Sequence, residues 1–297
     1  MQRKRLNTLL NVMDNPAMIE DAVFMHSVLC QAFLPYRNPG DDVRRYEQQQ
    51  GNASLLLTAG DLYNPKTKKF DQVGLPYGAK ARLVLAYLNT MAIKTQDPNI
   101  NIEESLTGFV KKLDLDPGGK TIRSVKEQLN RLAGTMINIG YSISDDRGLQ
   151  GKTGIIDTME LWLGKDEDQR VLWPGVVKLS PRFFDDLMAH SIPMDERVIA
   201  ALSNNAMAMD IYVWLVQRLH RVPHNKPAKV SWKAISDQFG GDNYTQIRKF
   251  RQNFRTSMKL VMGYYQDAKV EDTRSGLVLY NSPPPIGKTL IQLPKSK

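Results

Sequence analysis

The chain has 297 residues, of which 42% are hydrophobic and 24% are charged, so the composition excludes a wholly disordered protein and allows two domains of ordinary size. A formal net charge of +9 favours a polyanionic partner, and no apolar run approaches the roughly 20 residues that a membrane-spanning helix needs. Cys30 is the single cysteine, which excludes an internal disulfide and fits the reducing cytoplasm, where we expect the protein to act without a membrane partner.

Residues 1–73 are predicted to be a lead-in that packs on the domain after them. Apolar residues before Pro35 favour a mainly helical segment over residues 1–36, and residues 44–50 are expected to be a helix or loop. The stretch ASLLLT, residues 53–58, is typical of a buried strand. The stretch NPKTKKF, residues 64–70, is rich in turn formers and charge, and is predicted to be a polar loop.

Residues 74–180 predict the first of two domains. Apolar spacing indicates three helices, over residues 74–94, 102–115 and 120–136. The alternating stretches MINIGYSI (136–143) and IIDTMELWL (155–163) then predict a hairpin around the polar turn DDRGLQGKTG. Helix, turn, basic helix and hairpin are the elements of a winged helix, in which the second helix of the helix-turn-helix enters the DNA major groove.

Residues 181–283 predict a second domain of the same plan. A short helix over 181–188 and one or two helices over 193–220 precede the stretch VSWKAISDQFGG, which predicts a helix that ends at a turn. A basic helix and a hairpin-like segment, AKVEDTRSGLVLY, follow it. The fold class expected is therefore α+β, with two tandem winged-helix domains and a flexible tail over residues 284–297.

The basic helix of the second domain is predicted over residues 242–262, with Asp242, Asn243 or Thr245 as its N-cap. At 3.6 residues per turn, one stripe is apolar and a neighbouring stripe is cationic. The apolar stripe holds Ile247, Phe250, Phe254, Met258 and Val261. The cationic stripe holds Arg248, Arg251, Arg255 and Lys259, and its length predicts that this helix dominates DNA affinity while the first domain's helix refines it.

Candidate DNA contacts are the polar side chains of the two basic helices and of the two wings. Arginine and lysine neutralise phosphates, while Arg, Gln, Asn and Thr can also meet base edges. In the first domain the candidates are Lys120, Arg123, Lys126 and Asn130 of the helix, with Arg147 and Lys152 of the wing. In the second domain they are Thr245, Gln246, Arg248, Lys249, Arg251, Gln252, Arg255 and Lys259 of the helix, with Arg274 of the wing.

Motifs for catalysis are absent from the sequence. Three GK-T triplets lack the glycine that a phosphate-binding loop needs five residues before, because Asp114, Asp146 and Ser282 occupy those positions. His220 and His224 have no nearby cysteine or suitable carboxylate to complete a zinc set, and no closely spaced histidine pair of a rolling-circle nickase exists. We therefore expect no enzymatic activity, no cofactor and no metal site.

Three stretches carry a resemblance to a known family: FMHSVLCQAFLPYRNP (24–39), GLPYGAKARLVLAYLNTMAIKTQDP (74–98) and ESLTGFVKKLDLDPGGK (104–120). Over residues 20–280 the chain resembles the plasmid-encoded RepA family of replication initiators, and the GLPYG segment is the most specific part. The resemblance implies two winged-helix domains that bind repeated sites in a plasmid origin. It further implies that binding promotes duplex opening and brings in a host replication initiator and the replicative helicase.

Two other functions stay open at the level of sequence. A winged-helix transcriptional repressor would need only a bound operator, and the protein's own promoter is a candidate site of that kind. A nuclease that nicks the origin is the alternative from a different class, and a metal-dependent cleavage assay on supercoiled plasmid would separate it. The sequence does not decide between a monomer and a homodimer.

Overall fold

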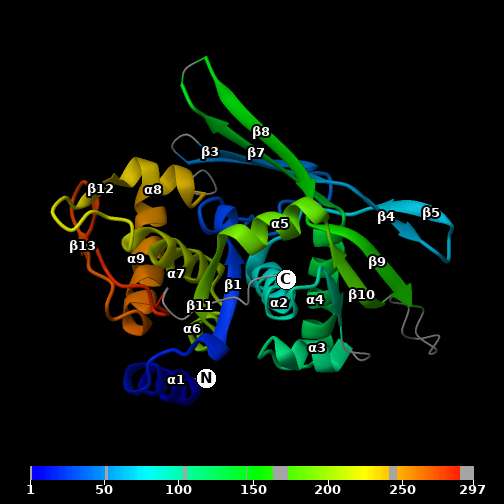
Figure 1. Cartoon of the computed structure of the whole chain (residues 1–297), viewed down its shortest axis with the longest axis horizontal. Helices are drawn as coiled ribbons and strands as arrows, with labels where there is room; N and C mark the ends of the chain where they lie inside the picture. The colour runs from blue at the N-terminus through cyan, green and yellow to red at the C-terminus, as the bar shows by residue number, and fades with distance from the viewer. Residues whose placement is uncertain are drawn as a thin grey trace, which may run out of the picture. The chain divides into compact units, whose positions relative to one another are not determined.

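The computed structural model describes residues 2–50, 53–102, 106–144, 146–162, 173–240 and 246–287 (Figure 1). Helices and strands are both frequent, which confirms the predicted mixed class. The chain divides into two compact units. The first to be described comprises Leu34–His190, and the second combines Met1–Phe33 with Ser191–Lys297.

The unit Leu34–His190 contains a helical group packed beside a three-stranded sheet. Helix α4 packs against α2, α3 and β9, and Val125, Leu129 and Leu132 on α4 are completely buried. Burial of such side chains is the main source of stability here. The elements are α2 (Gly78–Thr95), β6 (Asn99–Asn101), α3 (Leu106–Lys112), α4 (Gly119–Ala133), β9 (Ile156–Trp162), β10 (Trp173–Leu179) and α5 (Pro181–His190), with sheet order β6-β10-β9.

A separate four-stranded antiparallel sheet in this unit corrects one prediction. The stretch MINIGYSI forms β7 (Thr135–Ser142), but β7 pairs with β8 (Gly148–Gly154), which the sequence predicted as a turn. β9 pairs with β10 instead. β3 (Ala53–Ala59) confirms the predicted strand, but over residues 54–59 only alternate residues, Leu55, Leu57 and Ala59, are buried. β3 lies between β7 and β2 (Arg45–Gln50), and β2 is a strand where the sequence predicted a helix or loop.

The predicted polar loop over residues 64–70 is the end of a second hairpin. Strand β4 (Asp61–Asn64) pairs with β5 (Lys69–Gln72), and no other described strand hydrogen-bonds to either of them. The turn residues of NPKTKKF thus connect two short strands that the sequence did not predict.

The unit with Ser191–Lys297 is built around one buried helix, α7. Tyr212, Trp214 and Leu215 of α7 are completely buried, and Trp214 and Phe239 meet edge to face at 5.4 Å between ring centroids. The elements of the C-terminal part are β11 (Ser191–Asp195), α6 (Glu196–Ala201), α7 (Ala206–Leu219), β12 (Ala228–Ser231), α8 (Trp232–Gln238), α9 (Ile247–Tyr264), β13 (Val270–Asp272) and β14 (Gly276–Leu279), with sheet order β12-β14-β13.

Both units share one order of elements. In each, a long buried helix, a strand, a short helix and a basic helix are followed by two strands, and the sheet order is first strand, third strand, second strand. The β7–β8 hairpin is an addition between the basic helix α4 and the last two strands of its unit. The internal duplication inferred from element order therefore extends to the strand order of the two sheets.

The N-terminal segment pairs with a strand far along the chain. β1 (Ala22–His26) forms an antiparallel ladder with β11, and all five residues of β1 are buried. Helix α1 (Gln2–Asp14) packs against α6 and α9. Residues 1–33 therefore belong with the C-terminal residues, whereas the sequence had predicted that residues 1–73 pack on the first domain. In the tail, Ile286 is 1% exposed, and residues 288–297 lie outside the described part.

Candidate nucleic-acid interface

Helix α9 has the two stripes that its sequence predicts. Phe250, Phe254 and Val261 are at most 1% exposed, whereas Ile247, in the first turn, is 46% exposed and lies outside the core. The predicted caps Asp242, Asn243 and Thr245 fall outside the described residues, and Gln246 occupies the N-cap position without a side-chain cap bond.

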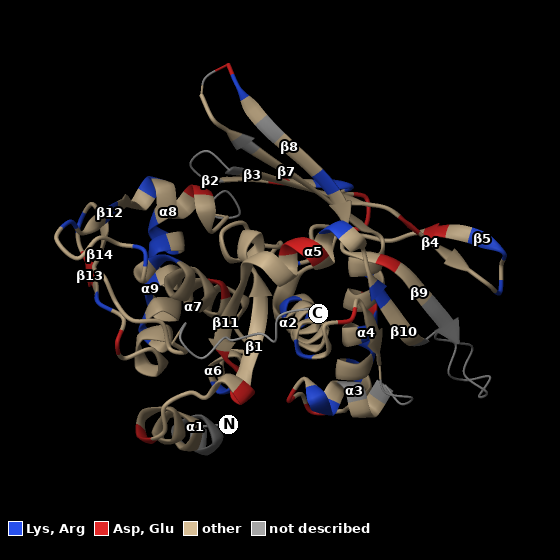
Figure 2. Cartoon of the chain, viewed as in Figure 1, with Lys and Arg blue, Asp and Glu red and all other residues tan. Residues whose placement is uncertain are grey.

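The exposed positions of α9 are polar or cationic along most of its length, and Figure 2 shows blue segments, which mark Lys and Arg, along its ribbon. Lysine and arginine on this face can neutralise phosphates, and Gln246 and Gln252 can meet base edges. No described residue forms an ion pair with Arg248, Lys249 or Lys259, so these cations are available to a partner. The exposed candidates are Gln246, Arg248, Lys249, Gln252, Arg255 and Lys259.

Two arginines of α9 are held by a buried tryptophan of α8. The guanidinium groups of Arg251 and Arg255 lie 5.5 and 4.8 Å from the ring centroid of Trp232, within the range of cation–π attraction. Trp232 is 1% exposed and donates its indole N–H to the Thr273 carbonyl at 3.2 Å. It is therefore a core residue that supports the basic helix rather than a platform for bases.

A pocket of about 250 Å³ lies between α9 and the β13–β14 hairpin, with Trp232 of α8 also in its lining. At its edge, Arg255 donates two hydrogen bonds to the Asp272 carboxylate, at 2.6 and 3.0 Å, and this pairing raises the pKa of Arg255. Met258, Lys259 and Met262 line the same pocket. Arg274 lies exposed in the turn of the hairpin. The acid of the hairpin thus neutralises one of the predicted DNA contacts.

The basic helix of the other unit, α4, presents fewer cations than predicted. Lys120 and Arg123 are exposed and Asn130 is half-buried. Lys126 is only 4% exposed, its Nζ has no hydrogen-bond partner among the described residues, and burial lowers its pKa to about 7. Because α4 is covered by α2, α3 and β9, its buried face is wider than a single apolar stripe and includes Lys126.

Lys80 of α2 is a cation that sequence reasoning missed. Partial burial and the nearby charge of Lys120 both lower the pKa of Lys80. The two ammonium groups therefore repel each other near the start of α4, where unpaired backbone N–H groups also favour an anion. Only the packing of α2 on α4 brings Lys80 here, so no local pattern in the sequence could have identified it.

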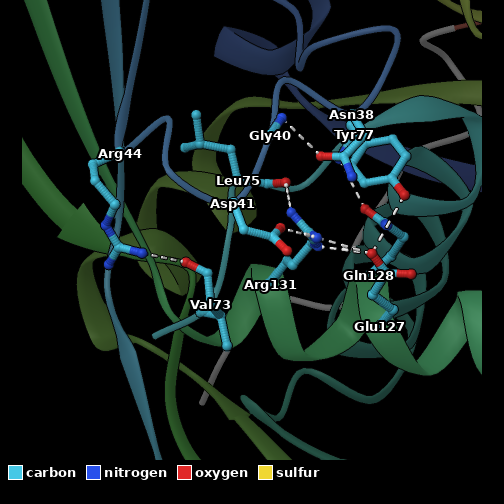
Figure 3. Close-up of polar contacts among 10 residues, drawn as sticks. All are labelled: Asn38, Gly40, Asp41, Arg44, Val73, Leu75, Tyr77, Glu127, Gln128 and Arg131. Atoms are coloured by element: carbon cyan, nitrogen blue, oxygen red, sulfur yellow. Dashed lines mark hydrogen bonds and ion pairs between the residues drawn. The ribbon is translucent and has the colours of Figure 1, made fainter. Parts of the chain in front are cut away.

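The GLPYG segment anchors α4 through Arg131 (Figure 3). The Arg131 guanidinium donates to the Leu75 carbonyl at 3.1 Å, to Asp41 at 2.5 Å and to Glu127 at 2.9–3.0 Å, and it lies 5.1 Å from the ring centroid of Tyr77. The Tyr77 N–H donates to Gln128 at 2.8 Å. Residues that precede α2 thereby fix the position of the basic helix.

A glycine is required at the first position of this anchor. A Cβ atom at Gly74 would collide with the Arg131 guanidinium and with the Asp41 carboxylate. The guanidinium cannot move aside without losing the contacts that hold α4. The GLPYG segment therefore needs glycine at position 74 because its backbone packs closely against the Arg131 guanidinium.

The two predicted wing contacts of the first domain lie on a different element. Arg147 is in the turn between β7 and β8, and Lys152 is on β8, opposite Asn138. Both are exposed, but they belong to the four-stranded sheet. The strands β9 and β10 take the hairpin position, and the residues between them, 163–172, lie outside the described part.

The comparisons with known proteins agree with this architecture. The family model for the plasmid-encoded RepA protein matches residues 75–236. The chain belongs to the RepA family. The match begins inside the GLPYG anchor, next to Gly74, and ends in α8. No curated protein matches the chain.

Two solved structures share the fold of this RepA family member. A selenomethionine derivative of domains 2 and 3 of RctB is 10% identical, with a TM-score of 0.53, and the alignment covers 86% of this chain and 99% of that one. A second structure of RctB domains 2–3 is 11% identical, with a TM-score of 0.50 and coverage of 85% and 94%. At such identities the likeness concerns the fold alone.

In the described ranges, no group of three or more His, Cys, Asp or Glu residues is arranged to hold a metal ion. None of the helices in that part of the chain has the length and apolar character that crossing a bilayer requires.

Proposed function

We propose that this RepA family member initiates plasmid replication by binding repeated duplex sites in the origin through two winged-helix units. The observation that carries the proposal is the duplicated order of elements, with an exposed cationic row on α9 and a smaller basic group of Lys80, Lys120 and Arg123 at the start of α4. In a winged helix this is the helix that enters the major groove. A protein with two such units suits an origin that contains repeats.

The two basic helices have different roles in this proposal. Helix α9 supplies most of the affinity because its cations extend along several turns. Helix α4 contributes a compact phosphate contact at its start and refines the choice of site. Opening of the duplex and recruitment of a host initiator and helicase would follow binding, as the family resemblance implies.

Footprinting on the DNA that flanks the protein's own gene tests the proposal. We expect protection of direct repeats, with an affinity that falls steeply with salt. Each phosphate contact should contribute about −0.9 to the slope of log affinity against log salt concentration. Equal affinity for random duplex, or a flat salt response, would overturn origin-specific binding. Protection of a promoter operator without repeats would favour the repressor instead.

A further inference from the structure

The β4–β5 hairpin carries an exposed aromatic pair that the proposed duplex interface does not use. Tyr63 and Phe70 are directly opposite each other in the ladder, so they share one face of the hairpin. Their ring centroids are 5.5 Å apart at an interplanar angle of 61°. Phe70 is nevertheless 72% exposed and Tyr63 44%, which leaves open ring surface available for a partner.

The turn of the hairpin and the start of β5, residues 65–70, carry three lysines and no acid. Asp61 is 3.6 Å from the Arg44 guanidinium, and Asp71 accepts a hydrogen bond from the Asn64 amide at 2.7 Å. The three cations of the hairpin have no such partners: no described residue forms an ion pair with Lys66, Lys68 or Lys69. In Figure 2, blue marks Lys and Arg on the ribbon of this hairpin near β5. The aromatic pair therefore lies next to three cations that have no described ion-pair partner, and the exposed acid beside it, Asp71, is held by the Asn64 amide.

The turn is fixed in a conformation that is unfavourable for one of its lysines. Lys68 has a φ of 55°, in the left-handed region that side chains other than Gly and Asn seldom adopt. The Asn64 side chain accepts hydrogen bonds from the N–H groups of Lys66 and Thr67, and the Asn64 carbonyl accepts from Lys68. Strained backbone of this kind concentrates at functional sites, so the conformation of Lys68 is consistent with a functional turn.

We propose that this hairpin binds single-stranded DNA, with unpaired bases stacking on Phe70 and Tyr63 and phosphates contacting Lys66, Lys68 and Lys69. Aromatic rings interleaved with cations are the recurring chemistry of single-strand binding, since every base has a π face. Bases inside a duplex present no such face. The inference rests on the proposed function, because it takes DNA as the partner. In it, the β4–β5 hairpin binds the unpaired strand, whereas α4 and α9 bind the duplex.

The test uses the full-length protein and a fluorescently labelled oligothymidine of about 15 nucleotides, a length within the usual single-strand site sizes. Phe70→Leu keeps an apolar contact with Tyr63 but removes the ring, and should weaken binding about 5- to 100-fold. Phe70→Trp should keep the affinity, and its added indole fluorescence should be quenched by the oligonucleotide. Lys226 is an exposed lysine in a loop of the other unit. Lys226→Ala should leave single-strand binding unchanged, and it is the control for loss of one surface charge.

A further variant separates folding from binding. Lys68→Gly removes the ammonium group and suits the left-handed conformation, so single-strand binding should weaken while the thermal midpoint stays the same or rises. A lower thermal midpoint together with unchanged binding would contradict the role assigned to Lys68.

Two competition arms decide whether bases or charge alone are recognised. Polyglutamate of equal charge should compete far less well than oligothymidine, and equal competition would overturn the stacking proposal. Duplex origin DNA should bind the Phe70→Leu variant as well as it binds the wild type. If duplex binding holds but the variant binds single strands normally, only the hairpin inference fails. If the wild type binds no duplex, the proposed function fails.

Discussion

The side chain of Lys126, which was predicted to contact DNA, is buried in the folded protein. Its ammonium group has no described partner, and burial brings its pKa to about 7, below the usual value of 10.5. The folded state therefore binds fewer protons than the unfolded state between about pH 7 and pH 10.5. Wild-type stability should rise with pH through this window, since the free energy needed to release the proton on folding falls as the pH approaches 10.5.

Lys126→Met should therefore raise the free energy of unfolding at pH 6 by an amount on the order of a few kcal/mol. The gain should shrink toward pH 10. Urea unfolding at several pH values measures both effects. Arg123→Met, at an exposed position on the same helix, is the control and should change stability by no more than about 0.5 kcal/mol. A gain independent of pH would show that the pKa of Lys126 is the same in the folded and the unfolded protein, and would contradict the effect of burial.

Asp272 holds the Arg255 guanidinium, so under the proposed function it should compete with DNA phosphates for this arginine. The exposed ion pair contributes at most about 1 kcal/mol to folding, so Asp272→Asn should leave the protein folded. The variant should bind the origin fragment more tightly, and its salt slope should become steeper by up to about 0.9, as one more cation meets phosphate. Titrations at several salt concentrations measure this. Tighter binding with an unchanged slope would mean that Arg255 reads no phosphate.

At the scale of the element, the GLPYG anchor should control the position of α4. Gly74→Ala should destabilise the protein by about 1–3 kcal/mol, because the new methyl group displaces a guanidinium held by three acceptors. Gly119→Ala is the matched control, since a Cβ there meets nothing within 4 Å. It should be neutral or slightly stabilising in the first turn of α4. Chemical denaturation of both variants measures the difference, and equal stability would refute the anchor.

The two basic helices should differ in their contribution to affinity. Arg248→Ala should cost about 1–3 kcal/mol of binding if the side chain reads a base. Arg123→Ala should cost less, because α4 presents fewer exposed cations after the burial of Lys126. Titration on one origin fragment at fixed salt, with circular dichroism as the folding control, compares them. A larger loss from Arg123→Ala would assign the primary recognition helix to α4.

Helices were predictable from sequence because their information is local. The apolar spacings of α2, α4 and α9 place each helix within a few residues of its observed bounds. Strand partners are not local, and β8 contains three glycines and a charge, so its sequence resembles a turn. The same limit explains why Arg147 and Lys152 were predicted on the last hairpin of the first domain but lie on the β7–β8 hairpin.

The candidate site was predictable only in part, for a related reason. Helical periodicity separates the exposed Arg248 from the buried Phe250, but it cannot tell how many neighbours cover a helix. Lys126 is buried because three elements pack on α4, and Lys80 joins the basic cluster because α2 lies beside it. The ion pair of Arg255 with Asp272 depends on the packing of the β13–β14 hairpin beside α9. Each of these features depends on tertiary contacts between elements that are distant in the sequence.

For the whole molecule, the division into two units predicts independent contributions to binding. Arg248 and Arg123 belong to different units, so their single substitutions should add within about 0.5 kcal/mol in the double variant. A thermodynamic cycle of the four proteins on one origin fragment measures the coupling. Strong coupling of either sign would show that the units bind as one cooperative body rather than side by side on their sites.

The pairing of β1 with β11 also orders events during synthesis. β1 emerges from the ribosome early, but its partner strand β11 emerges only after the whole of Leu34–His190 has been made. At usual elongation rates this delay lasts roughly 10–30 s, during which five residues destined for burial stay uncovered. The middle of the polypeptide can complete its fold within that interval. β1 and β11 must then pair after the intervening domain has folded. This late pairing is therefore the step most exposed to chaperones and aggregation.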